Sequence, residues 1–294
     1  MRLHNTFPAA LRDRSRPAKA LLTLAVFALM GLATRTGQAT PSTAFWTPAT
    51  AYLQPFAVPH ITYDTYFGDK GSYAIDAGLT MGLLPWKVFQ LEVGFDFLFP
   101  NTVKTAIQFN AKLGIPEGAF GKWMPGITTG VYGIGLTKGV SDQDIWHAEI
   151  GKTFMVGEQS LGTIAAGAYY GLGDDATWAG SDGTVRRVGF IGSYTSPDIP
   201  INRPGLNKIN FVGDVQTGKN GVGGGGVAMG LYFTPAIALL TGPVFFFDRD
   251  KQPGKSLMLW SLQLDVDIDF RRPTPPPPDA PATPPPPPAP APDA

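Results

Sequence analysis

The stretch WSLQLDVDIDF, residues 260–270, alternates apolar and polar side chains without interruption. Successive side chains of a β-strand point to opposite faces, so this strand has one apolar face and one polar face. The apolar face is formed by Trp260, Leu262, Leu264, Val266, Ile268 and Phe270, and the polar face by Ser261, Gln263, Asp265, Asp267 and Asp269. Such a strand belongs to a sheet whose two sides meet different surroundings.

The same period of two recurs along the chain. It is clearest in 72–83, 88–99 and 105–115. Weaker strands are predicted at 59–67, 126–137, 143–154, 160–172, 186–196, 206–217, 222–234 and 235–247. Together with 260–270 this predicts an all-β antiparallel fold of about twelve strands, with a range of about 10–14, and an even number suits a single-chain membrane barrel.

Composition favours a transmembrane barrel over a soluble sandwich or lipocalin-type barrel. Charged residues make up 16% of the chain, against about 25% in ordinary soluble domains. The polar faces carry mostly Gly, Thr, Ala, Gln and Asn, which suits a narrow interior. The apolar faces carry many Phe and Leu, too bulky for the inside of a small barrel. The apolar faces therefore point to lipid.

Residues 1–39 have the pattern of a Sec-type signal peptide. A basic stretch precedes the apolar run ALLTLAVFALMGLA, and Gly37-Gln38-Ala39 predicts cleavage after Ala39. Removing 6 of 23 basic and 1 of 23 acidic residues leaves 17 and 22, a net charge of −5. This balance argues against nucleic acid as a partner. The chain has no cysteine, which excludes disulfides and thiolate metal sites.

The closing stretch resembles the last strand of bacterial outer-membrane β-barrel proteins, which ends in an aromatic residue after alternating apolar ones. The resemblance implies a location in the outer membrane of a Gram-negative cell, with membrane lipid and the barrel assembly machinery as partners. It also implies that Trp260, Leu262, Leu264, Val266, Ile268 and Phe270 form the assembly signal. Here the barrel is expected to cover 59–270.

Two further segments flank this barrel. Residues 271–294 are dominated by proline and are expected to form a disordered, extended periplasmic tail. The tail is similar to the Pro/Ala linker of OmpA-type barrels, and its partner could be the cell wall or a proline-recognising protein. Residues 40–58 form an N-terminal extension rich in aromatic residues and proline, which could enter the lumen as a plug or lie outside the barrel.

Alternation predicts which side chains face the lumen. They are Asp76, Glu92, Asp96, Gln108, Asn110, Lys112, His147, Glu149, Asn210, Asp214, Gln216, Gln263, Asp265, Asp267 and Asp269. The excess of carboxylates would favour cations if water fills the lumen, or pair across a closed interior. His147 and Glu149 could shuttle protons, but no third ligand or nucleophile is visible, so neither a catalytic residue, a metal nor a cofactor is expected.

Three functions remain open. The first is a narrow porin-like channel or small-solute transporter in the outer membrane. The second is a structural envelope barrel that conducts nothing and whose Pro-rich tail acts as a periplasmic tether. The third is an outer-membrane enzyme that modifies lipid or peptide.

Overall fold

The computed structural model describes residues 43–68, 75–99, 107–137 and 142–271. The expected signal peptide, and all of the expected tail except Arg271, lie outside these ranges. The strands are β1 (His60–Phe67), β2 (Ile75–Gly82), β3 (Gln90–Phe99), β4 (Ile107–Ile115), β5 (Gly126–Gly135), β6 (Ile145–Val156), β7 (Gln159–Gly171), β8 (Val188–Thr195), β9 (Ile199–Arg203), β10 (Leu206–Gln216), β11 (Gly224–Thr234), β12 (Ile237–Phe246) and β13 (Met258–Asp267). The short helices within the described ranges are α2 (Asp175–Trp178), η1 (Arg249–Lys251) and η2 (Pro253–Lys255).

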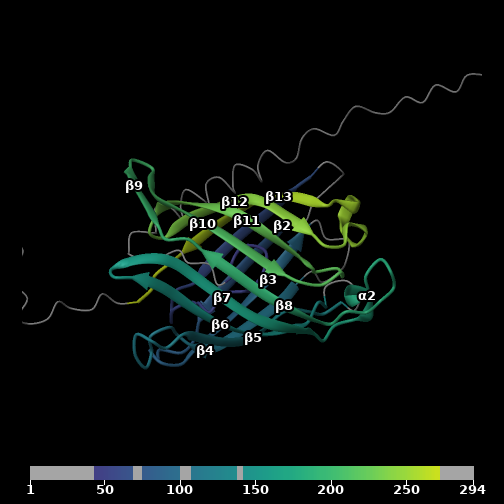
Figure 1. The fold of residues 1–294 in the computed structure, drawn as a ribbon, viewed down its shortest axis with the longest axis horizontal. Coiled ribbons are helices and arrows are strands. Elements are labelled where there is room, and N and C mark those ends of the chain that lie inside the picture. The colour runs from purple at the N-terminus through teal and green to yellow at the C-terminus, as the bar shows by residue number, and fades with distance from the viewer. Residues whose placement is uncertain (1–42, 69–74, 100–106, 138–141, 272–294) are drawn as a thin grey trace, which may run out of the picture.

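Twelve of these strands form a closed antiparallel barrel (Figure 1). Neighbours in sequence are neighbours in the sheet from β1 to β8, β8 pairs with β10, and β10 to β13 continue the ring. Closure comes from β1 and β13, which pair from His60 opposite Asp267 to Phe67 opposite Trp260. Each strand of this ring therefore pairs with a neighbour on both sides, as a sheet surrounded by lipid requires.

The thirteenth strand, β9, was not expected from the sequence and does not belong to the ring. It forms a hairpin with the first residues of β10, Leu206 to Ile209. Among the described strands, β9 pairs with β10 alone. Pro204 and Gly205 make the turn, and Gly205 has a positive φ of 81° that this kind of turn requires. That Pro-Gly pair is the signal that would have revealed the hairpin.

The outer surface of the barrel is apolar. Large apolar side chains stand exposed on strand after strand, among them Phe109, Trp146, Ile150, Phe190, Phe211 and Trp260. Polar side chains of the same strands are buried in the interior, among them Gln108, His147, Asn210 and Gln263. In the described part of the chain, none of the helices is long and apolar enough to cross a membrane.

The closing strand ends earlier than the sequence suggested. The expected strand 260–270 is observed as Met258–Asp267, so Ile268, Asp269 and Phe270 lie beyond it. The reason is its partner: β1 begins at His60, and the preceding Pro59 has no N–H to continue the ladder. The Ile268 N–H still donates to the Pro59 carbonyl, over 2.9 Å, after which the pairing becomes irregular.

Candidate functional site: the plugged barrel interior

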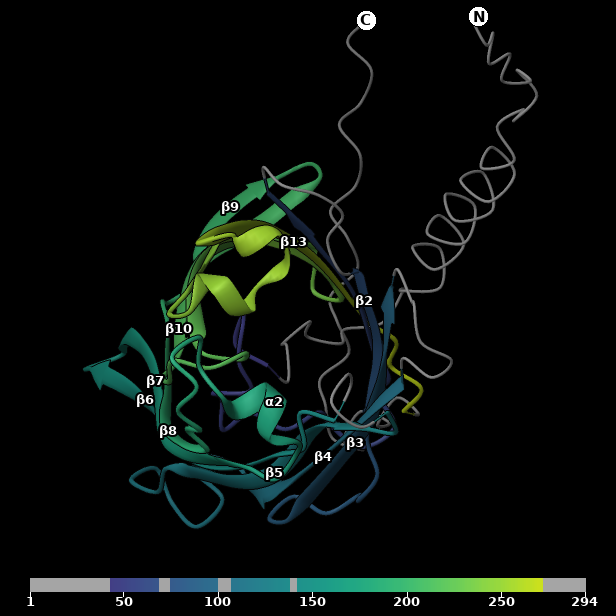
Figure 2. The same cartoon turned by 90° about the vertical axis from the view of Figure 1, so that its right-hand side faces the viewer.

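Residues 43–59, called the plug below, run inside the barrel. In Figure 2, which looks along the barrel, the purple segment between the N-terminal grey trace and β1 lies within the ring of strands. Its residues Ala44, Phe45, Thr47, Ala49, Leu53 and Gln54 are at most 5% exposed. Of the two placements that the sequence left open for this segment, the structure has the one inside the lumen.

The turn at the far end of the plug, its apex, is held by one carboxylate. Oδ2 of Asp214 on β10 accepts hydrogen bonds from the backbone N–H groups of Phe45, Trp46 and Thr47 over 2.9, 2.7 and 2.8 Å. Oδ1 of the same carboxylate accepts from the N–H of Gly226 on β11 over 3.1 Å. Three consecutive backbone N–H groups thus form a nest around a negative charge of the wall.

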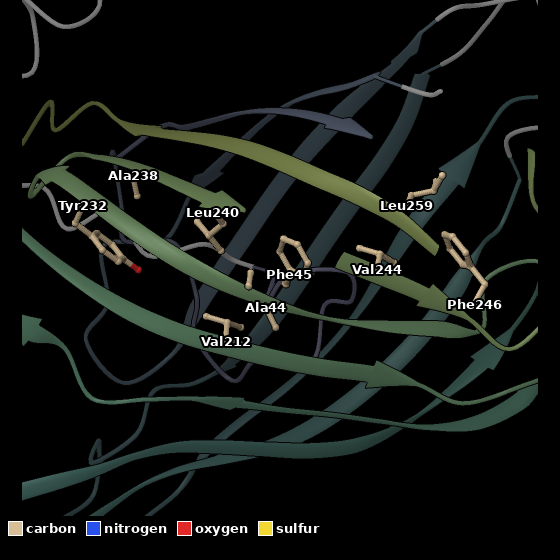
Figure 3. Close-up of a cluster of buried hydrophobic side chains, with 10 residues drawn as sticks. Ala44, Phe45, Val212, Tyr232, Ala238, Leu240, Val244, Phe246 and Leu259 are labelled. Carbon is tan, nitrogen blue, oxygen red and sulfur yellow. The ribbon is translucent and has the colours of Figure 1, made fainter. Parts of the chain in front are cut away.

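Apolar packing also holds the apex. Phe45 lies in a buried cluster with Val212, Leu240 and Val244 (Figure 3). The Trp46 ring meets the Phe246 ring edge to face with centroids 5.3 Å apart. Inward positions on β12 are therefore apolar, in contrast to the polar side chains that alternation predicted for the lumen. Both faces of β12 are apolar because one meets the plug and the other lies on the outer surface.

The plug also contacts three other strands through its carbonyl groups. Gln263 Nε2 donates to the Phe45 carbonyl over 2.9 Å. The Ser193 hydroxyl donates to the carbonyl of Ala49. Lys112 Nζ donates to the Thr50 carbonyl over 3.4 Å. Gln263 and Lys112, which alternation placed in the lumen, thus serve here as partners of the plug backbone, together with Ser193.

The base of the plug is held where the barrel closes. The Gln54 N–H donates to Glu92 Oε2 over 2.7 Å, and Gln54 Nε2 donates to Asp267 Oδ1 over 3.0 Å. Phe56 forms an isolated parallel β-bridge with Gly82, the last residue of β2. A Cβ at Gly82 would lie 2.2 Å from the Gln54 carbonyl oxygen, so this approach requires glycine.

A histidine lies between two carboxylates directly beneath this base. His60 Nδ1 is 2.8 Å from Asp267 Oδ1, and its Nε2 is 3.6 Å from Asp265 Oδ1. All three side chains are almost completely buried. Asp267 therefore binds the plug and β1 at the same time, which links the plug to the strand pair that closes the barrel.

The structure places most of the predicted lumen residues in the interior. Glu92, Gln108, Lys112, His147, Glu149, Asn210, Asp214, Gln216, Gln263, Asp265 and Asp267 are between 1 and 8% exposed. Asp76, Asp96 and Asn110 are partly buried, and Asn110 donates to Asp96. Asp269 lies beyond the end of β13, where its carboxylate accepts hydrogen bonds from Arg271.

Sequence reasoning missed several interior residues. Asp64, His60 and Tyr66 lie on the inward row of β1, and Gln54 and Ser193 bind the plug. The first three could have been found, because the β1 stretch HITYDTYF alternates like the other strands. Asp64 stands directly opposite Asp76 in the register of β1 and β2.

Several interior carboxylate oxygens have no hydrogen-bond donor among the described residues. They are Oδ1 of Asp64, Oδ1 of Asp76, Oδ2 of Asp265 and Oδ2 of Asp267. Within the same ranges, no group of three or more His, Asp or Glu side chains is arranged to hold a metal ion. The described interior is therefore rich in carboxyl groups but lacks a compact metal-ligand set.

His147 and Glu149 come together as the alternation suggested. His147 Nδ1 lies 2.5 Å from Glu149 Oε1, and Glu149 Oε2 accepts from the Thr128 hydroxyl over 2.9 Å. The Tyr132 ring meets the imidazole edge to face. The Thr128 hydroxyl bonds to the carboxylate and the Tyr132 hydroxyl to Gln216, and neither bonds to the imidazole, so the arrangement lacks the order of a nucleophile, base and orienting acid.

Loops cover the mouth opposite the base of the plug. α2 lies across the opening in Figure 2, and Trp178 is buried against Tyr169 and Gly171. Arg186 donates two hydrogen bonds to Asp182, and they hold the pKa of that exposed carboxyl well below its ordinary value. Asp248 accepts from the Ser181 N–H over 2.6 Å and so joins two of the mouth loops.

Comparison with known proteins gave matches among solved structures only. No family model matches the chain, and no curated protein does. The NanC porin is 10% identical, with a TM-score of 0.42, over 71% of this chain and 98% of that one. An outer membrane channel from Pseudomonas putida has the same identity and TM-score over 75% and 98%. Outer membrane phospholipase A from Escherichia coli is 9% identical, with a TM-score of 0.41, over 74% and 94%.

These solved structures are bacterial outer-membrane β-barrels: a porin, a channel and a phospholipase. At such identities and TM-scores, nothing about substrate or activity passes from them to this chain.

Proposed function

We propose that this protein is an outer-membrane channel for small cations that the plug holds closed at rest. The observation that carries the proposal is the inward row of carboxylates. Asp64, Asp76, Asp265 and Asp267 each have a buried oxygen without a donor in the described part of the chain. Burying such oxygens costs free energy unless water or a cation meets them.

The outer surface supports placement in a membrane. Its exposed apolar side chains continue around the barrel, and the strands of the ring have 8 to 13 residues. About 9–11 residues of a tilted strand cross a bilayer. Exposed Trp86 and Trp123 lie in turns at one end, where aromatic side chains favour the membrane interface.

The plug supports a closed resting state. It contacts β3, β4, β8, β10 and β13 from inside, so it crosses the lumen from wall to wall. Most of these contacts are single hydrogen bonds to polar side chains. A typical hydrogen bond contributes about 1 kcal/mol net, so a segment held in this way can leave without unfolding the barrel.

Single-channel recording in a planar bilayer tests this function. We expect residues 40–294 to show rare openings, and the same chain lacking residues 43–54 to carry a steady, cation-selective current. Replacing Asp64 and Asp76 together by asparagine should lower that selectivity, whereas Asp182→Asn on a mouth loop should leave it unchanged. Silence from a truncated barrel whose insertion has been verified by protease protection would overturn the channel.

A structural barrel is the second candidate, favoured by the apolar packing of Phe45 against Val212 and Leu240 inside the lumen. In that case the interior is a core, and residues 271–294 would tether the barrel to the cell wall. Deleting 271–294 would then weaken the cell envelope without changing any current, which separates the two functions.

A further inference from the structure

The barrel wall is incomplete beside β8. This strand ends at Thr195, where it is paired with Thr163 of β7 and Val212 of β10. Beyond the end of β8, the first residues of β7, from Gln159, pair with β6 alone. The first residues of β10, from Leu206 to Ile209, pair with β9 on one side and β11 on the other. The hairpin of β9 and the hairpin of β6 and β7 therefore face each other without a shared ladder at the end away from α2 (Figure 1).

A cavity of about 1050 Å³, lined by both polar and apolar side chains, lies in this break. The plug lines it with Thr43 and Thr50, and the wall lines it with hydroxyl side chains such as Ser160 and Thr163. It contains one cation and one anion that neutralise each other, because Lys208 Nζ lies 2.6 Å from Asp198 Oδ2. Lys208 Nζ also lies 4.5 Å from the centre of the Tyr232 ring. The cavity thus offers hydroxyl groups and a matched pair of opposite charges.

An apolar groove of about 460 Å³ adjoins this cavity on the outer surface. Its walls are Tyr194, Phe211, Val227, Pro243 and Trp260. Phe211 and Val212 line both spaces, so the groove lies directly beside the cavity. Gly213 leaves the floor of the groove open: a Cβ there would meet only ordinary van der Waals contacts, the nearest 3.5 Å away.

We propose that the cavity and the groove together bind one zwitterionic phospholipid of the surrounding membrane. A phosphoethanolamine headgroup has the charge pattern of the cavity, with its phosphate toward Lys208 and its ammonium toward Asp198. An acyl chain fits the groove, which belongs to the lipid-facing surface and runs from Phe211 toward Trp260. The cavity lies at the strand ends, which is the level of the headgroups in a membrane-spanning barrel.

Native mass spectrometry of the full chain in detergent, titrated with palmitoyl-oleoyl phosphatidylethanolamine, tests this site. We expect one lipid molecule to stay bound to the protein at a collision energy that removes all other lipid and detergent molecules. Gly213→Leu should fill the groove and weaken binding at least tenfold. Ala166→Leu adds similar bulk to the outer surface of β7, away from the groove, and should leave binding within twofold. Phe211→Ala should also weaken lipid binding, and it replaces Gly213→Leu in the test if that variant does not fold.

The headgroup has its own variant. Asp198→Asn leaves Lys208 without its carboxylate partner and should shift the preference from phosphatidylethanolamine to phosphatidylglycerol. An unchanged preference would overturn the assigned headgroup. Equal binding by the parent chain, Phe211→Ala and Gly213→Leu would overturn the site. A dimer that Gly213→Leu abolishes would also overturn the lipid site, because a second copy of the chain would then occupy the groove. Binding of free phosphoethanolamine as tight as that of the whole lipid would overturn it as well, because the groove would then contribute nothing.

Discussion

At its apex the plug gives three backbone N–H groups to a single carboxylate, whereas at its base it spreads its hydrogen bonds over Glu92 and Asp267. Asp214 has no part in the closing strand pair, but Asp267 stands opposite His60 in that pair. The difference indicates two kinds of attachment. The apex can detach while the barrel stays intact, but the base shares a residue with barrel closure.

The absence of native cysteine allows this comparison to be measured with single thiols. Ala49→Cys reports on the plug near its apex and Leu53→Cys near its base, because both native side chains are buried. The rate of maleimide labelling in the folded, inserted protein then measures how often each part of the plug opens.

Asp214→Ala should have the largest effect. Three N–H groups of the plug lose their acceptor, at about 1–3 kcal/mol each. Because about 1.4 kcal/mol corresponds to a factor of ten, labelling at Ala49→Cys should rise at least about 100-fold. Asp214→Asn keeps one acceptor oxygen and should give a smaller rise. Unchanged labelling in Asp214→Ala would show that apolar packing alone holds the apex.

Glu92→Gln should have a smaller and more local effect. The Gln54 N–H then donates to a neutral oxygen in place of a charged one, a loss of about 1 kcal/mol. We expect about fivefold faster labelling at Leu53→Cys and little change at Ala49→Cys. An equal rise at both thiols would mean that apex and base open as one unit, against the distinction drawn above.

The mouth loop should respond least and leave the plug unaffected. Arg186 lowers the pKa of Asp182 in the folded protein. Their ion pair therefore stabilises the folded loop fully at pH values above 3.8, the ordinary pKa of an aspartate, and this stabilisation is lost only as the pH falls through the lower pKa of the folded state. Exchange of the Thr184 amide hydrogen, which bonds to Asp182, should therefore keep its protection factor from pH 6 to pH 4. Asp182→Asn should lower that factor at pH 6. A loss of protection already at pH 5 would contradict the assigned shift.

Alternation predicted most of the barrel because it is a property of each strand by itself. The alternation of their immediate neighbours determines the side of the sheet on which Glu92, His147 and Gln263 lie. Their burial could therefore be predicted from the local sequence. The end of the last strand could not, since it depends on Pro59, more than 200 positions earlier. The proposed role of Trp260 to Phe270 as an assembly signal stays a prediction.

The plug could not be derived from the sequence for the same reason. Residues 40–58 have no period, and Phe45 meets Asp214 across 169 positions. Asp214 was expected in the lumen, but nothing near it in sequence shows that it accepts three N–H groups. The apolar inward side of β12 follows from the same contact, because Leu240 and Val244 pack against the plug.

The link between His60 and Asp267, 207 positions apart, constrains the order of assembly. The first strand follows directly after the plug, and the strand that seals the ring is the last to be made. The hydrogen bonds that join Gln54 and His60 to Asp267 can form only when β13 reaches β1. Docking of the base of the plug and sealing of the barrel are therefore coupled in biogenesis.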